Sequence, residues 1–174
     1  FIDEFTALPN RPDLIFIDCA LDRSQPTLSA LAAADNVILV VSPEPRSITG
    51  AYALVKQLAL DFGQQNVHLL ASKIRDDADA AAVYSNMLDA SRRSLRATAD
   101  YIAAIALDDA IKRANRLGTT VLEAFPAAPS SERFRDLARA LVAWPIAAAE
   151  HGRLEAFVDR LIMMADLATT GLHA

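Results

Sequence analysis

The sequence predicts an α/β protein with a doubly wound, mainly parallel sheet, because short apolar runs alternate along the chain with helical stretches. The runs are almost entirely apolar and do not alternate with polar residues, which is typical of strands that helices cover on both faces. Hydrophobic residues make up 53% of the chain and charged residues 22%, as in a globular domain with a core. We therefore expect helices on both faces of the sheet, followed by further C-terminal helices.

The apolar runs predict four strands, at 13–18, 37–41, 67–71 and 101–105. Helical spacing predicts helices at 27–34, 48–62, 77–98, 108–116, from Pro129 to Trp144, and 153–167. For the helix at 48–62, Ser47 or Thr49 is the expected N-terminal cap, and Gly63 is the expected C-terminal stop. In the helix after Pro129, we expect Phe134, Leu137, Ala138 and Leu141 to point inward.

The last helix is amphipathic and follows the expected end of the main domain. Its apolar positions recur at helical spacing, and its polar positions carry both signs of charge without an excess of Lys or Arg. Helices that lie on membranes normally have a basic polar face, so we expect this helix to pack onto the domain or onto a partner. Membrane contact through 153–167 is the alternative. The sequence thus predicts a main domain at 1–143 and a helical tail at 144–174.

The composition excludes several classes of protein. A net charge of −5 argues against direct binding to nucleic acid, which needs a basic surface. The single cysteine, Cys19, excludes a disulfide framework and a cysteine-rich zinc site. The sequence shows neither a secretory signal nor an apolar run long enough to span a membrane. We therefore expect a cytoplasmic protein, with the inner face of the membrane as the alternative location.

Ligands of parallel α/β sheets bind at the carboxyl ends of the strands, which here are followed by Asp18, Val41, Ala71 and Ile105. The apolar run that ends in Asp18 has the form of a Walker B strand. A carboxylate at that position can hold the water shell of Mg²⁺ beside nucleotide phosphates. The alternative is an ordinary loop aspartate that caps the next turn. We expect His68 to be a packed histidine, and Asp76, Asp77 and Asp79 to favour a helix start.

Several segments resemble the MinD/ParA family, and within it the regulators of flagellar number (FlhG/FleN-like proteins). The similar segments are 43–56, 61–63, 108–114, 121–126, 144–145 and 153–161. The resemblance implies an ATPase that dimerises around ATP and Mg²⁺, restrains a flagellar transcriptional activator and works with a flagellar GTPase. By the same resemblance, Asp18 would act on Mg²⁺ or water. The residues lining the base would be Ser72, Lys73, Ala106, Leu107 and Asp108.

The sequence departs from this family at the nucleotide loops. No Gly-Lys-Thr or Gly-Lys-Ser occurs among the 174 residues, so we expect the phosphate loop upstream of Phe1 and expect this chain alone to be inactive. Asp22 stands where the family has glycine, Ser72 where it has asparagine, and Ala106 where it has proline. These changes leave an alternative open: a degenerate, non-catalytic member that acts through protein–protein contacts.

Overall fold

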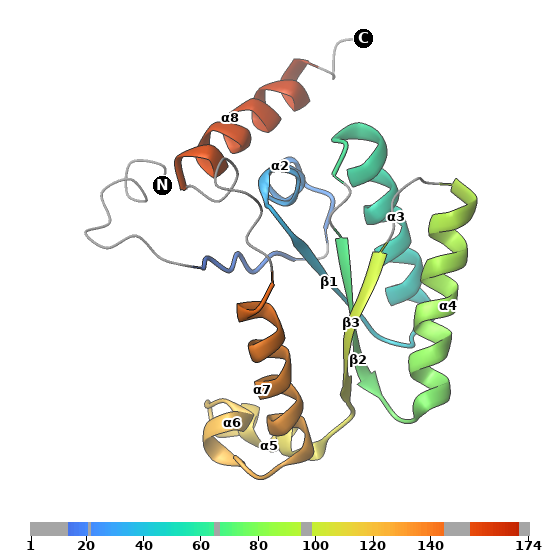
Figure 1. The fold of residues 1–174 in the computed structure, drawn as a ribbon, viewed down its shortest axis with the longest axis vertical. Helices are drawn as coiled ribbons and strands as arrows, with labels where there is room; N and C mark the ends of the chain where they lie inside the picture. The colour runs from blue at the N-terminus through green and yellow to red at the C-terminus, as the bar shows by residue number, and fades with distance from the viewer. Residues whose placement is uncertain (1–13, 21, 65–66, 95–98, 145–153, 171–174) are drawn as a thin grey trace.

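The computed structural model describes residues 14–20, 22–64, 67–94, 99–144 and 154–170. Within these ranges, the sheet has three parallel strands in the order β1-β2-β3 (Figure 1). The strands are β1 (Val37–Val41), β2 (Val67–Ile74) and β3 (Ala99–Ala106). The predicted parallel α/β sheet is therefore confirmed. The bounds of β1 agree with the prediction, whereas β2 and β3 are longer than predicted.

Helices connect the strands and extend the chain beyond them. They are α2 (Gln25–Ala33), α3 (Pro45–Asp61), α4 (Asp77–Ser94), α5 (Asp109–Arg116), α6 (Val121–Ala124), α7 (Pro129–Val142) and α8 (Leu154–Thr170). Every predicted helix is present. The start of α4 and the end of α5 agree with the prediction, the predicted residues 95–98 and 153 lie outside the described residues, and most other ends are shifted. The short helix α6 was not predicted, because a single turn is too short to show an apolar period.

Helices cover both faces of the sheet, as the uninterrupted apolar strands predicted. On one face, Leu54 and Leu58 of α3 and Met87 of α4 join a cluster with alternate residues of β1 and β2. On the other face, Leu137 of α7 packs with Leu70 and Ile105. Figure 1 shows α3 and α4 on one side of the strands and α7 on the other. The prediction that Ala138 points inward was wrong, because it lies on the exposed side of α7.

The start of α3 differs from the prediction. The helix begins at Pro45, whose fixed φ angle suits the first helical position, and Glu44 is the N-cap without a capping side-chain bond. Ser47 therefore lies inside the first turn, where its Oγ accepts a hydrogen bond from the Ser42 amide at 3.0 Å. The expected cap at Ser47 or Thr49 was wrong. The C-terminal stop was correct, since Gly63 has a φ of 67°.

The predicted strand at 13–18 is not found. Residues 14–20 have no regular secondary structure, and Leu14 and Phe16 are 54% and 67% exposed. Residue 13 lies outside the described residues. An apolar run becomes a strand only when a neighbouring strand supplies hydrogen bonds. Among the described residues, β1 pairs only with β2, and nothing pairs with the run at 14–17.

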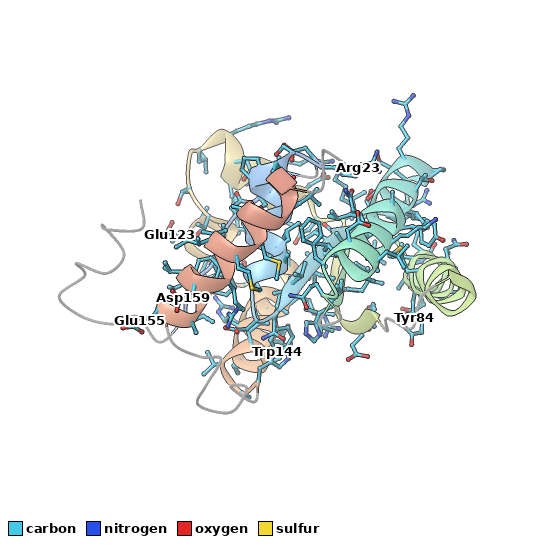
Figure 2. All side chains as sticks on the ribbon, turned by 90° about the horizontal axis from the view of Figure 1, so that it is seen from above. Arg23, Tyr84, Glu123, Trp144, Glu155 and Asp159 are labelled. Carbon is cyan, nitrogen blue, oxygen red and sulfur yellow. The ribbon has the colours of Figure 1, made fainter. Side chains whose placement is uncertain are left out.

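The C-terminal helix α8 lies on α2, which agrees with the expected packing onto the domain. Val158 is buried, and the Arg160 Nε donates to the Ala33 carbonyl at 2.8 Å. The Arg160 Nη2 also pairs with Asp35 at 2.7 Å. Acidic residues Glu155 and Asp159 project from the outer side of α8 (Figure 2). Among the described residues, no helix combines the length and the apolar character needed to cross a membrane.

Candidate functional site

The carboxyl ends of β2 and β3 bring most of the predicted base-lining residues together. In the parallel register, Ser72 lies beside Ile105 and Ile74 lies beside Ala106. The Leu107 amide then donates to the Ile74 carbonyl at 2.8 Å, which extends the pairing one step past the sheet. Leu107 is 49% exposed, so an apolar side chain stands open to solvent at this edge. The same edge of the sheet thus carries the polar residue Ser72 and the exposed apolar side chain of Leu107.

Lys73 has an unusual backbone at the same edge. Its φ is 58°, and the ladder between β2 and β3 shifts register between Ser72 and Ile74. A positive φ is uncommon for a residue other than glycine, and it departs from the extended backbone of a regular strand. The Lys73 Nζ lies 3.7 Å from Oε1 of Glu44, which follows β1. Both side chains are largely exposed, so the pair adds little stability, but it places a cation and an anion over neighbouring strand ends.

Asp108 is held in place by the helices that follow β3. Its carboxylate accepts from the Ala110 amide at 2.8 Å, from the Ser130 amide at 3.2 Å and from the Ser130 Oγ at 2.7 Å. The Ser130 hydroxyl contributes most to holding the pKa of Asp108 below its usual value, followed by the Ala110 amide. Asp108 therefore caps α5 and ties it to α7. The hydrogen bonds of Asp108 are therefore made to residues of these two helices, and they do not indicate a ligand.

Two residues of this arrangement were missed at the level of sequence. Ser130 is fully buried although it follows Pro129 at a helix start, where serine is usually solvated. Glu44 was part of the segment at 43–56, but no role was predicted for it. The doublet of serines after Pro129 was a usable signal, because Ser131 is buried as well. Its Oγ donates to the carbonyls of Val121 and Phe125 and thereby fixes α6 against α7.

Asp18 is not brought to the edge of the sheet by any strand. It is exposed within the irregular segment 14–20. Farther along, Asp22 accepts hydrogen bonds from the Ser24 amide and hydroxyl at 3.0 and 2.8 Å. Hydrogen bonds from the Thr27 side chain, and then from Ser24, lower the pKa of Asp22, so it is an anion at neutral pH. Beside it, a hollow of about 340 Å³ is lined by Asp22, Arg23, Thr49, Gly50, Ala53 and Leu54.

No cluster of three or more His, Cys, Asp or Glu side chains suited to a metal ion occurs within the described ranges. The acidic run at 76–79 starts α4, as predicted: the Asp79 amide donates to Asp76 Oδ1 at 2.8 Å, and Asp79 pairs with Arg75. His68 also behaves as predicted. Its ring centroid is 4.3 Å from that of Trp144, and its Nε2 is 3.0 Å from Asn36 Oδ1.

The fold and the site define the class of protein: a parallel α/β domain with helices on both faces and candidate ligand loops at the carboxyl edge of its strands. The chain is 32% identical to the antiactivator FleN of Pseudomonas aeruginosa over 161 residues, which are 92% of this chain and 58% of FleN. The flagellum site-determining protein YlxH of Helicobacter pylori is 26% identical over 114 residues, 65% of this chain and 38% of YlxH.

An uncharacterised ATP-binding protein of Methanocaldococcus jannaschii, MJ0547, is 23% identical over 161 residues, which are 90% of this chain and 56% of that protein. No family model matches the sequence. The chain belongs to the MinD/ParA-type ATPase family, as a homologue of FleN and YlxH. It spans a little over half of FleN and of MJ0547, and less of YlxH.

Proposed function

We propose that this chain is part of an ATP-dependent switch protein that regulates the number or placement of flagella. The observation that carries the proposal is the similarity along 92% of the chain to FleN, which is named an antiactivator, together with the similarity to YlxH, which is named a flagellum site-determining protein. In this proposal, residues 1–143 are part of the switch domain and residues 144–174 form its tail. The protein would work in the cytoplasm, with the inner membrane face as the alternative location.

The proposed nucleotide site uses the edge of the sheet described above. Ser72, Lys73, Ala106 and Leu107 would line the base, and Asp108 would hold their loop against α5. The gathering of the first four residues at one edge supports this assignment. Asp18 would act on the water shell of Mg²⁺, which supplies charge neutralisation beside the phosphates when it is bound. Support for Asp18 comes from the resemblance alone, since the described part of its segment, 14–20, is not paired with the sheet.

Phosphate binding needs backbone amides and a lysine that this sequence does not supply, because it has no Gly-Lys-Ser/Thr. We therefore propose that the chain by itself does not turn over ATP. In the ATP-dependent form we propose a homodimer around the nucleotide, with a flagellar transcriptional activator and a flagellar GTPase as partners. These partners follow from the family resemblance.

A second candidate function has its own support. Asp22 is an anion where the family has glycine close to the last phosphate, and a carboxylate at that point repels a triphosphate. Asp108 also already accepts three hydrogen bonds, from Ser130 and Ala110. Both features suit a regulator that keeps the fold and its protein-binding surfaces and handles ATP weakly.

The test is the binding and turnover of a fluorescent ATP analogue with Mg²⁺, by this chain and by a version with any residues encoded upstream of Phe1. We expect only the extended version to bind and hydrolyse, and we expect Asp18→Ala to abolish turnover there. Asp159→Ala, an exposed aspartate on α8, is the matched control and should leave turnover unchanged. Turnover by the chain alone would contradict its proposed inactivity. Two folded proteins that both fail to bind would support the non-catalytic regulator.

A further inference from the structure

The end of α5 and the short helix α6 form one surface that joins arginines to apolar side chains. Arg113, Arg116 and Leu117 follow one another at i, i+3 and i+4, so they share one side of α5. The Arg113 guanidinium carbon lies 4.5 Å from the centroid of the Phe125 ring, at the end of α6. This contact connects the two helices, since Phe125 is the C-cap residue of α6, and Leu122 lies on α6 three positions before it. We call these five residues the α5–α6 surface.

The apolar part of the α5–α6 surface is open to solvent. Leu117 is 67% exposed and Leu122 is 37% exposed. Scattered exposed leucines need no explanation, but here one lies four positions after Arg113 and the other three positions before the half-buried Phe125, and Arg113 and Phe125 are in contact. The buried Ser131 fixes α6 in place, because its Oγ donates to the carbonyls of Val121 and Phe125. The surface is therefore preformed and combines apolar area with donors.

The α5–α6 surface carries the positive charges of Arg113 and Arg116. Among the described residues, neither Arg113 nor Arg116 forms an ion pair, whereas Lys112 on the same helix pairs with Asp109 at 2.9 Å. Glu123, the acidic residue of α6, is turned toward Thr119 and Thr120, whose hydrogen bonds hold the pKa of its carboxyl below the usual value. Two guanidinium groups without an ion-pair partner in the described ranges thus lie on a chain whose net charge is −5.

We propose that the α5–α6 surface binds an acidic amphipathic helix of a partner protein. The leucine-like side chains of such a helix would cover Leu117 and Leu122, and its carboxylates would pair with Arg113 and Arg116. An arginine stacked on an aromatic ring keeps its N–H edge free, which suits bidentate binding of a carboxylate. Charge complementarity favours this occupant over a nucleic acid or an anionic membrane, since two cations on an acidic protein make few phosphate contacts.

The α5–α6 surface is separate from the proposed nucleotide site. None of its five residues is among those proposed to contact ATP or Mg²⁺. Figure 1 shows α5 and α6 together at one end of the molecule, beside the start of α7. The inference therefore stands independently of the proposed function, and its test needs no nucleotide.

The test uses the ¹⁵N-labelled chain and a short model helix with leucine on one face and glutamate on the other. The control peptide has lysine in place of glutamate. We expect amide shifts to concentrate between Arg113 and Phe125 with the glutamate peptide only. Arg113→Glu combined with Arg116→Glu should weaken binding by about tenfold or more, as the loss of two charge contacts implies. Leu117→Ser should weaken it as well.

The matched control is Arg46→Glu combined with Lys56→Glu, which makes the same charge change on the exposed side of α3. It should leave the affinity within about twofold, because long-range charge effects are screened at physiological salt. The proposal is overturned if both peptides bind equally, if neither binds, or if the control variant weakens binding as much. It is also overturned if the Arg113/Arg116 variant instead loses binding to phosphatidylglycerol vesicles, or changes the oligomeric state in sedimentation.

Discussion

Arg160 should decide how firmly α8 is held on α2. Its Nε donates to the Ala33 carbonyl at the C-terminal end of α2, at 2.8 Å, and its Nη2 reaches Asp35 at 2.7 Å. A hydrogen bond from a charged donor contributes about 1.5–3 kcal/mol, and this figure includes the favourable place of a cation at a helix C-terminus. The pair with Asp35 is partly exposed, at 21% and 39% of the two side chains, and adds less than about 1 kcal/mol.

We therefore expect Arg160→Ala to favour the opening of α8 by about 2 kcal/mol, which is roughly a 30-fold change in the opening equilibrium. Asp35→Asn removes the ion pair with Arg160 and should change the opening by about fivefold at most. Arg160→Lys keeps the charge, cannot contact both groups with a planar fork, and should fall between them. Amide hydrogen exchange of α8 measures the opening directly.

The control for this series is Asp159→Ala, because Asp159 neighbours Arg160 on α8 and is exposed. Substitutions at such positions usually change stability by less than about 0.5 kcal/mol. Unchanged exchange in Arg160→Ala would refute the role of Arg160. An equal effect of Asp35→Asn and Arg160→Ala would show that the ion pair, and not the bond to the α2 carbonyl, holds the helix.

Three further predictions concern the domain itself. Ser131→Ala should lower the free energy of unfolding by about 1 kcal/mol, and Ser130→Ala should lower it more. The reason is that Ser130 donates to a carboxylate, whereas Ser131 donates to neutral carbonyls. Urea unfolding of the two variants tests this order, and the opposite order contradicts it. Burial lowers the pKa of His68, so stability should be full above pH 6.5 and decline as the pH falls through 6.5 toward the folded value. Trp144 fluorescence in urea at pH 7.5 and 5.5 should show this slope, and His68→Gln should flatten it. Phe16 is 67% exposed in an apolar run, so the chain should self-associate as its concentration rises. Phe16→Ser should reduce this self-association. A monodisperse wild-type monomer in sedimentation would count against the prediction.

The local sequence determined the positions of most helices and of the three strands that pair in the sheet. The apolar run of β1 and the period of α3 could be read directly, because a covered strand and an amphipathic helix impose different spacings on apolar residues. Gly63 marked the end of α3, since glycine accepts a positive φ without strain. The single turn of α6 and the early start of α3 at Pro45 carried too little pattern to be placed from the sequence.

The sequence alone also identified the residues at the ends of β2 and β3, because parallel strands bring their carboxyl ends to one edge. It could not predict that Ser130 holds Asp108, since those residues lie on different elements and a buried serine looks like a solvated one until the packing is known. The failed strand at 13–18 has the same origin. An apolar run indicates that a segment can form a strand, but the hydrogen bonds of a strand are made to a neighbouring strand. Only the tertiary structure decides whether such a neighbour pairs with it.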